Sequence, residues 1–211
     1  MNAYPELVSE GYNVLHINPL GYATPDGPAD DKLVGGVWPV MPDTAASLGR
    51  KGYVDWLSDA ILAVRWGLEQ ECVESGRYAF FGSSQGGGTA LLLASVLRER
   101  GVRCVAADVP GLINIPSIGA REPCQREALL GPIDRIAAER PSDLPAAWKA
   151  LGYVDVLGHA HRLTMPVLLT AGDQDTTCPA ENIRALFELL CGTRSYTEIE
   201  GQAHGYTRHF L

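Results

Sequence analysis

A single strand-to-helix turn constrains the fold of this chain more than any other feature. The apolar run Tyr78-Ala79-Phe80-Phe81 passes at once into a glycine-rich turn, and a long apolar segment follows from Thr89 to Val96. In the turn, Gly82 and Gly86 flank Ser84. A strand that bends abruptly into a helix needs such small neighbours, because the turn residue is held in a strained conformation. The segment therefore predicts a strand, a sharp turn at Ser84 and a helix.

Predicted strands and helices alternate along the rest of the chain. Further strands are expected at 11–18, 102–109, 167–170 and 196–200, and further helices at 54–68 and 183–190. Such alternation is typical of an α/β fold, with a mostly parallel sheet flanked by helices. The sequence shows no repeat or linker, and 211 residues normally form one domain, so we expect a single domain over 1–211.

Two regions break this alternation. The segment from Pro19 to about Arg50 is rich in Gly, Pro and Asp and predicts a long surface loop. The region 111–162 contains helical patterns near 133–140 and 144–151. We expect this second region to be a cap-like insertion that covers the carboxyl end of the sheet.

Ser84 is the candidate nucleophile. The turn projects its hydroxyl oxygen into the open, and it directs the backbone N–H of Gln85 toward an oxyanion that develops at the positive end of the following helix. A structural Ser/Gly loop is the alternative, but it does not explain why glycines stand so close to the serine. Gly87 and Gly88 fit close packing of the helix on the sheet, and Ser83 is expected to be structural.

A serine hydroxyl is a poor nucleophile at neutral pH, so it needs a base. The chain has five histidines: His16, His159, His161, His204 and His209. After a serine on such a turn, the acid and then the histidine follow along the chain, which excludes His16. The His-X-His pair has no third metal ligand nearby and is expected to be solvated surface. His204 follows the last predicted strand after a short turn, so we expect it to be the base, with His209 the less favoured substitute.

The acid is expected just past the predicted strand at 167–170. Asp173 and Asp175 both lie there, and the next helix is expected to start at Pro179, which suits a first turn. We favour Asp175 as the acid that orients the histidine, and we expect Asp173 to stabilise the turn. Asp108 also ends a predicted strand, but a polar residue at the sheet edge is the simpler interpretation.

Composition argues against several kinds of partner. The net charge is −8 and the sequence has no Lys/Arg cluster long enough to follow a phosphate backbone, which argues against nucleic acid or an anionic membrane. No apolar stretch approaches the roughly 20 residues of a membrane helix, and the first residues lack a signal-peptide pattern. Five irregularly spaced cysteines indicate free thiols in a reducing compartment, so we expect a cytoplasmic protein. Cys178 is expected to have a packing or capping role.

Several motifs together resemble one family. They are Gly82-Ser83-Ser84-Gln85-Gly86-Gly87-Gly88, Ala107-Asp108-Val109-Pro110, Leu151-Gly152-Tyr153-Val154-Asp155-Val156, Met165-Pro166-Val167-Leu168, Gly172 through Asp175 to Cys178-Pro179, and Gly201-Gln202-Ala203-His204-Gly205. At these residues the chain is similar to the acetyl xylan esterase and cephalosporin C deacetylase family of carbohydrate esterases, in the α/β-hydrolase superfamily. The resemblance implies an α/β-hydrolase fold, a triad of Ser84, Asp175 and His204, and Gln85 as a backbone donor to the oxyanion. It also implies release of acetate from acetylated sugars and related small esters, without a metal or an organic cofactor.

The chain departs from that family at both ends. Family members carry more strands before the segment that resembles 11–18, and a His-Gly-Tyr-like loop there gives a second oxyanion donor without a counterpart here. Tyr4 to Glu10 resembles the end of the helix after that loop, and the chain stops seven residues after His204, where the family has a long helix. We therefore expect a fold reduced at the N-terminus, or a natural start before Met1, with an apolar sheet face exposed. Exposed patches usually meet a partner, so we expect a homo-oligomer.

Two functions are compatible with these residues. The first is a serine carboxylesterase or deacetylase acting on small acetyl esters, including acetylated sugars. The second is a hydrolase-fold protein with impaired or no catalysis that acts as a binding or assembly module. The complete Ser-Asp-His set favours the first, and the missing oxyanion donor favours the second. A peptidase suits the chain less, because peptidases of this fold usually carry an additional domain that 211 residues cannot hold.

Overall fold

The chain forms two compact units. The computed structural model describes residues 4–17, 53–74, 76–117 and 123–205. The first unit comprises residues 1–15, 65–114 and 155–211, and the second comprises residues 16–64 and 115–154. The single domain expected over the whole chain stays a prediction.

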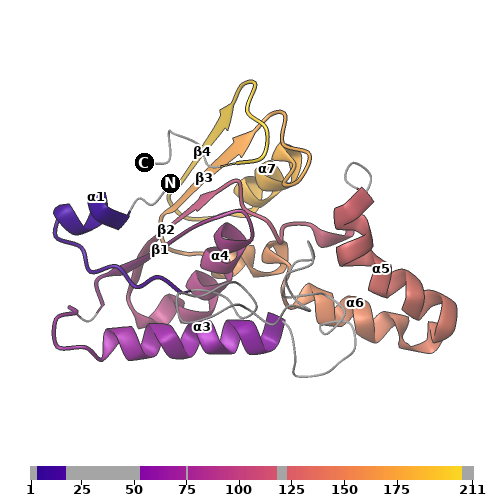
Figure 1. Cartoon of the computed structure of the whole chain (residues 1–211), viewed down its shortest axis with the longest axis horizontal. Coiled ribbons are helices and arrows are strands. Elements are labelled where there is room, and N and C mark those ends of the chain that lie inside the picture. The colour runs from indigo at the N-terminus through magenta and orange to yellow at the C-terminus, as the bar shows by residue number, and fades with distance from the viewer. Residues whose placement is uncertain (1–3, 18–52, 75, 118–122, 206–211) are drawn as a thin grey trace. The chain divides into compact units, whose positions relative to one another are not determined.

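The first unit is built on a four-stranded parallel sheet, whose strands stand side by side in Figure 1. In spatial as in chain order they are β1 (Tyr78–Ser83), β2 (Val102–Asp108), β3 (Val167–Gly172) and β4 (Arg194–Ile199). Every pair of neighbouring strands is parallel. The α/β fold with a parallel sheet and the four strands predicted after residue 77 are thereby confirmed.

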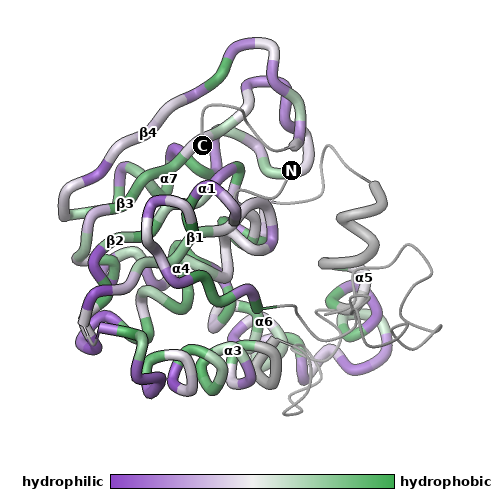
Figure 2. The backbone as a smooth tube through the Cα atoms, turned by 60° about the vertical axis from the view of Figure 1, so that its left-hand side comes forward, coloured by the Kyte–Doolittle hydropathy of each residue, from purple (hydrophilic) through white to green (hydrophobic). Residues whose placement is uncertain are grey.

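Helices connect and flank these strands. They are α4 (Gln85–Leu97), the 3-10 helices η1 (Arg98–Arg100) and η4 (Val156–Arg162), and α7 (Ala180–Leu189). α4 packs on β1 and β2, α7 packs on β3 and β4, and η4 contacts both helices. Figure 2 shows α4 as a mostly hydrophobic element and β4 as a mostly hydrophilic one. The apolar segment that predicts α4 is therefore its buried part, with Leu91 and Leu92 at 0% and 1% exposure.

The two faces of the sheet differ in exposure. Successive side chains of a strand point to opposite faces. On one face Val105 and Leu169 are 1% and 0% exposed. On the other face Phe81 and Leu168, which both lie beside Ala106 in the strand register, are 42% and 38% exposed. The sheet thus exposes apolar side chains on the second face, and the homo-oligomer expected from such a face stays a proposal.

The strand expected at 11–18 is not formed by the residues that the structure describes there. Residues 12–17 follow α1 (Tyr4–Ser9) and do not join the sheet. The side-chain amide of Asn13 instead donates to the carbonyl of Cys72 at 2.8 Å. The prediction was wrong because an apolar run reports only that a segment tolerates an extended conformation. Whether a neighbouring strand aligns with it depends on distant residues. α1 agrees with the helical segment expected near the N-terminus.

The second unit is helical in its described part. Its elements are α3 (Tyr53–Leu68), whose last residues belong to the first unit, η2 (Ile115–Ser117), α5 (Pro123–Glu139), η3 (Pro141–Asp143) and α6 (Leu144–Gly152). α5, η3 and α6 contact one another. The helices predicted near 133–140 and 144–151 are confirmed, and their role as a cap over the sheet stays a prediction. The loop expected at 19–50 lies outside the described residues.

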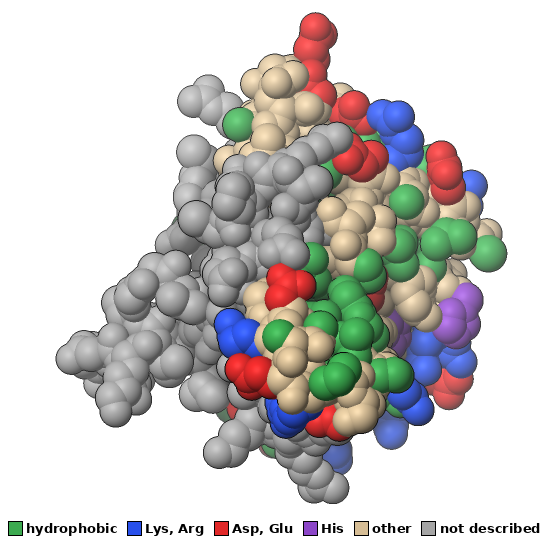
Figure 3. Space-filling view, turned by 90° about the vertical axis from the view of Figure 1, so that its right-hand side faces the viewer, with side chains coloured by type: hydrophobic (Ala, Val, Ile, Leu, Met, Phe, Trp, Pro, Cys, Tyr) green, Lys and Arg blue, Asp and Glu red, His purple; other side chains and the backbone are tan. Residues whose placement is uncertain are grey.

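Charge is mixed on the surface that Figure 3 shows. Lys and Arg side chains of the described residues lie among Asp and Glu side chains on this face. No helix in the described part of the chain is both long enough and apolar enough to cross a membrane. The expectation that neither nucleic acid nor a membrane is a partner stays a prediction.

Candidate active site

Ser84 occupies the turn between β1 and α4 in a strained conformation. Its backbone φ is 55° and its ψ is −125°, a left-handed φ that few residues other than glycine adopt. A Cβ atom at Gly82 would lie 2.3 Å from the carbonyl oxygen of Gly86, and one at Gly88 would lie 2.3 Å from that of Gly111. These close approaches explain Gly82 and Gly88, whereas a Cβ atom at Gly86 would meet nothing within 4 Å. Strain of this kind persists only where the surroundings fix it, often at functional sites.

Three backbone hydrogen bonds fix this turn. The N–H of Ser84 donates to the carbonyl of Asp108 at 2.9 Å, and the carbonyl of Ser84 accepts from the N–H groups of Gly88 at 3.1 Å and Gly111 at 2.8 Å. The turn is thus tied both to its own helix and to the segment that leaves β2. The side chain of Ser84 itself is half-buried.

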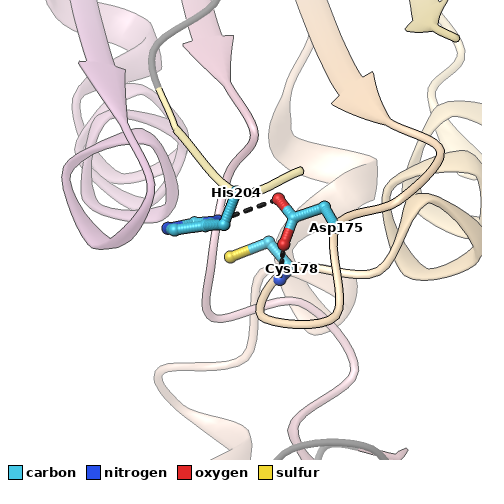
Figure 4. A group of neighbouring side chains, drawn as sticks. All are labelled: Asp175, Cys178 and His204. Carbon is cyan, nitrogen blue, oxygen red and sulfur yellow. Dashed lines mark hydrogen bonds and ion pairs between the residues drawn. The ribbon is translucent and has the colours of Figure 1, made fainter. Parts of the chain in front are cut away.

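The structure brings Ser84, His204 and Asp175 together. The Ser84 Oγ lies 2.9 Å from the His204 Nε2, and the His204 Nδ1 lies 2.8 Å from the Asp175 Oδ2. The Asp175 side chain is fully buried, whereas that of His204 is 30% exposed. Figure 4 shows the carboxylate facing one edge of the imidazole. This arrangement lets the ring accept the serine proton at one nitrogen while the other nitrogen donates to the carboxylate.

The loop between β3 and α7 holds the Asp175 carboxylate in place. Its Oδ1 accepts the backbone N–H groups of Thr177 and Cys178, each at 2.8 Å. Because these two bonds occupy Oδ1, the other oxygen is the one that faces His204. Asp173, the alternative acid, is exposed and accepts a hydrogen bond from the Gln174 side chain at 3.3 Å. It therefore lies in the turn, as expected, and is not part of the relay.

The other candidate residues lie elsewhere. His16 and His161 are exposed, and the His159 Nδ1 lies 3.5 Å from the Ser95 Oγ on α4. Among the described residues, the pair at 159 and 161 belongs to no cluster of potential metal ligands. His209 lies outside the described residues. His161 is therefore at the surface, as expected of the pair, whereas His159 is half-buried.

Asp108 is more deeply placed than its sequence position suggests. It is 0% exposed, and it ends the second strand of the sheet rather than an outer one. Its carboxylate accepts hydrogen bonds from the Thr170 Oγ1 at 2.5 Å and from the Ser83 Oγ at 3.1 Å. Ser83 therefore has the structural role expected of it, and Asp108 links β1, β2 and β3 through these two hydrogen bonds.

Gln85 begins α4, immediately after Ser84. Its backbone N–H therefore stands at the N-terminal end of the helix, where N–H groups and the helix dipole favour negative charge. This is the place where an oxyanion donor is required. Its role as that donor stays a prediction.

Sequence reasoning assigned Cys178 only a packing or capping role. The side chain is 5% exposed, but it lies close enough to Ser84 and Asp175 for both to affect its pKa. Burial raises the pKa of the Cys178 thiol, the Asp175 charge adds to this effect, and the bond to Ser84 opposes it. Its position three residues after Asp175, in the same turn, was the signal that could have placed it at the site.

The chain is similar to acetyl xylan esterases in sequence and in fold. Residues 50–211 match the model of the acetyl xylan esterase (AXE1) family. An acetyl xylan esterase from Paenibacillus sp. R4 superposes with a TM-score of 0.68 and 26% identity, over 83% of this chain and 55% of that protein. Acetyl xylan esterase 1 from Thermoanaerobacterium sp. JW/SL YS485 gives 0.64 and 22%, over 84% of this chain and 57% of that protein.

A more distant structure shares the fold alone. Est1E from Butyrivibrio proteoclasticus, solved with ferulic acid bound, gives a TM-score of 0.52 and 20% identity, over 74% of this chain and 61% of that protein. No curated protein sequence matches significantly. This chain spans little more than half the length of the two acetyl xylan esterases. Since the family model covers most of its residues, the chain belongs to the acetyl xylan esterase (AXE1) family, a family of carbohydrate esterases with the α/β-hydrolase fold.

Proposed function

We propose that this protein is a serine carboxylesterase that releases acetate from small acetyl esters. The observation that carries the proposal is the continuous relay from the Ser84 hydroxyl through His204 to the buried Asp175, with both steps at 2.9 Å or less. In this proposal Ser84 is the nucleophile, His204 the general base and acid, and Asp175 the group that orients the imidazole. The N–H of Gln85 stabilises the oxyanion.

The first half of the reaction forms an acyl-enzyme. The Ser84 Oγ adds to the ester carbonyl carbon while its proton passes to the His204 Nε2. The negative charge that develops on the carbonyl oxygen is met by the N–H of Gln85 at the start of α4. When the intermediate collapses, the imidazolium gives its proton to the departing alcohol, and the acetyl group stays on Ser84.

The second half returns the free enzyme. A water molecule gives a proton to the His204 Nε2 as its oxygen adds to the acetyl carbon. When this intermediate collapses, the bond to the Ser84 Oγ breaks, acetate leaves, and the imidazolium returns its proton to the Ser84 oxygen. Asp175 keeps the Nδ1 proton in place throughout, so that Nε2 remains the acceptor. Because Thr177 and Cys178 hold the opposite carboxylate oxygen, the ring keeps its orientation between the two steps.

The substrate class is inferred from the relatives. Two of the similar structures are named as acetyl xylan esterases, and we extend an acetyl ester on a carbohydrate to this chain on that basis. The chain spans only 55% and 57% of those proteins. The acetyl transfer needs only the relay, whereas the carbohydrate portion rests on the relatives alone.

Hydrolysis of 4-nitrophenyl acetate tests the proposal. Ser84→Ala removes the nucleophile and should lower kcat by on the order of 10⁶, as for other serine hydrolases with this triad. Ser83→Ala is the matched control, because it deletes the adjacent hydroxyl, which donates to Asp108 at 3.1 Å. This control should lose about 1 kcal/mol of stability and retain turnover far above that of Ser84→Ala.

The outcomes separate the two functions. Turnover that survives Ser84→Ala would exclude the serine mechanism. A folded wild-type protein that neither hydrolyses the ester nor is acylated at Ser84 would favour the alternative, a hydrolase-fold binding or assembly module. Acetylated xylan and 4-nitrophenyl esters of longer acids then define the alcohol and acyl specificity.

A further inference from the structure

We propose that Asp175, Cys178 and His204 form a binding site for a single thiophilic divalent cation of the Zn²⁺ class, and that the bound cation inhibits the esterase. The carboxylate oxygen, the Sγ atom and the imidazole nitrogen all lie within 4.8 Å of one another. Among the described residues this is the one such cluster. The inhibition rests on the proposed function, whereas the binding does not.

The three donors suit this class of cation. Carboxylate, thiolate and imidazole are the side chains that bind Zn²⁺, and three protein ligands with one open position are common. Figure 4 shows the Cys178 sulfur directed toward the imidazole of His204, with the Asp175 carboxylate beside the same ring edge. Asp175 and Cys178 are only 3% and 5% exposed. Their loop is fixed by its own backbone bonds to Asp175, so two of the ligands are already held in position.

The geometry requires only a small adjustment. Tetrahedral Zn²⁺ with bonds of about 2.0–2.3 Å separates its oxygen and nitrogen ligands by roughly 3.3 Å, and sulfur from either by roughly 3.6 Å. The Asp175 Oδ2 and the His204 Nδ1 lie 2.8 Å apart, and the cluster as a whole extends to 4.8 Å. His204 is the ligand that can move, since it follows the last strand and its side chain is 30% exposed.

The proton balance gives a neutral complex. The cation takes the place of the proton between Nδ1 and the carboxylate, that proton moves to Nε2, and the Cys178 thiol releases its proton to solvent. A dication, one carboxylate, one thiolate and a neutral imidazole sum to zero charge, which suits a site with two buried ligands. The fourth position is taken by water.

Replacement of the Nδ1 proton by the cation would prevent His204 from acting as the general base. In the relay Nε2 accepts the Ser84 proton across 2.9 Å. With the cation on Nδ1, Nε2 carries the proton and becomes a donor, so it no longer activates the serine hydroxyl. The cation therefore acts as an inhibitor of this enzyme and not as a cofactor.

Metal binding is tested first without any activity measurement. Chelator-treated protein is titrated with Cd²⁺, whose thiolate bond gives an ultraviolet charge-transfer band, and with Zn²⁺ in competition with a chromogenic chelator. The wild type and Cys191→Ser, which removes an exposed thiol, should each bind one tight equivalent with a thiolate band. Cys178→Ser should lose that band, and its affinity should fall by about tenfold or more.

Two further measurements keep the proposal open to refutation. His204→Ala changes a partly exposed side chain, so it should fold while its Cd²⁺ affinity falls by about tenfold or more. A band that persists in Cys178→Ser, or an affinity unchanged in His204→Ala, would overturn the site.

In the activity arm, Zn²⁺ should inhibit the wild type and Cys191→Ser, and a chelator should restore turnover. Inhibition that persists in Cys178→Ser at the same Zn²⁺ concentration would overturn the inhibitory role. A protein that binds one Cd²⁺ at Cys178 but has no esterase activity would refute the proposed function while leaving the metal site standing.

Discussion

Two groups of hydrogen-bonded polar side chains lie on the same sheet in opposite environments. The carboxyl-end network links β1, β2 and β3 and consists of Asp108 with Ser83 and Thr170, which both donate to its carboxylate. The β4 cluster lies on the edge strand and consists of Tyr196, Glu198 and Arg184 of α7. Asp108 and Thr170 are 0% and 3% exposed, whereas the side chains of Arg184 and Glu198 are 54% and 30% exposed.

The comparison shows that similar bonds have different consequences. In the β4 cluster, Tyr196 and Arg184 both donate to Glu198, and water replaces these bonds readily if one is lost. In the carboxyl-end network, water has no access to a group left unpaired, so each missing bond carries its full desolvation cost. The network behind Ser84 therefore fixes the candidate site, while the β4 cluster keeps an edge strand polar and protected from pairing with other chains.

Within this comparison the largest expected effect is at Asp175, a second buried carboxylate, which lies in the loop after β3 and faces the imidazole of His204. In Asp175→Asn, the amide oxygen keeps the two backbone N–H groups at 2.8 Å, so the amide NH₂ faces the His204 Nδ1. The ring then carries its proton on Nε2 and cannot act as the base. We expect kcat for 4-nitrophenyl acetate to fall by about 10⁴, with the protein still folded by circular dichroism. A decrease of less than tenfold would show that Asp175 does not set the tautomer of His204.

Next in size is the loss of one buried hydrogen bond in the carboxyl-end network. Thr170→Val removes the hydroxyl that donates to Asp108 at 2.5 Å and leaves a buried carboxylate with one partner fewer. We expect the free energy of unfolding, measured by denaturant titration, to fall by about 1–3 kcal/mol. Thr197 is its neighbour on β4 and is exposed, so Thr197→Val is the matched control. It should change stability by no more than about 0.5 kcal/mol. Equal losses in both variants would remove the distinction between the two environments.

The sequence predicted those parts of the site that depend on local pattern and chain order. Gly82, Ser84 and Gly86 define the turn by themselves, and His204 follows from its place after the last strand. The link between Asp108 and Thr170 was not predictable, because it depends on how two strands align across the sheet. No local signal carries that register. Cys178 was assigned to packing for a similar reason: its burial follows from residue type, but its contact with Ser84 requires the loop from β3 to meet the turn after β1.

A smaller effect is expected in the β4 cluster. The hydrogen bonds from Tyr196 and then Arg184 lower the pKa of Glu198 from its ordinary value of 4.5. A carboxylate with a lowered pKa stabilises the fold above the unfolded value, and this stabilisation is lost as the pH falls through the folded value. Glu198→Gln should therefore shift the unfolding midpoint at neutral pH by less than Thr170→Val does. The difference between Glu198→Gln and the wild type should shrink as the pH falls below 4.5 and through the lowered pKa of Glu198. A shift as large as that of Thr170→Val would place the β4 cluster among the determinants of stability.

The smallest effect concerns the ionisation of Tyr196. Burial and the hydrogen bond to Glu198 raise its pKa from 10.0 to about 12, although Arg184 opposes the shift. Because the folded state holds this proton more tightly than the unfolded state, its contribution to stability is complete below pH 10. That contribution is lost as the pH rises toward 12. The difference in tyrosinate absorbance between the wild type and Tyr196→Phe isolates this phenol from the other tyrosines. It should develop near pH 12, with no change in esterase activity at neutral pH. A difference spectrum that develops near pH 10 would mean that water reaches the phenol freely, and that the β4 cluster is weaker still than its hydrogen bonds suggest.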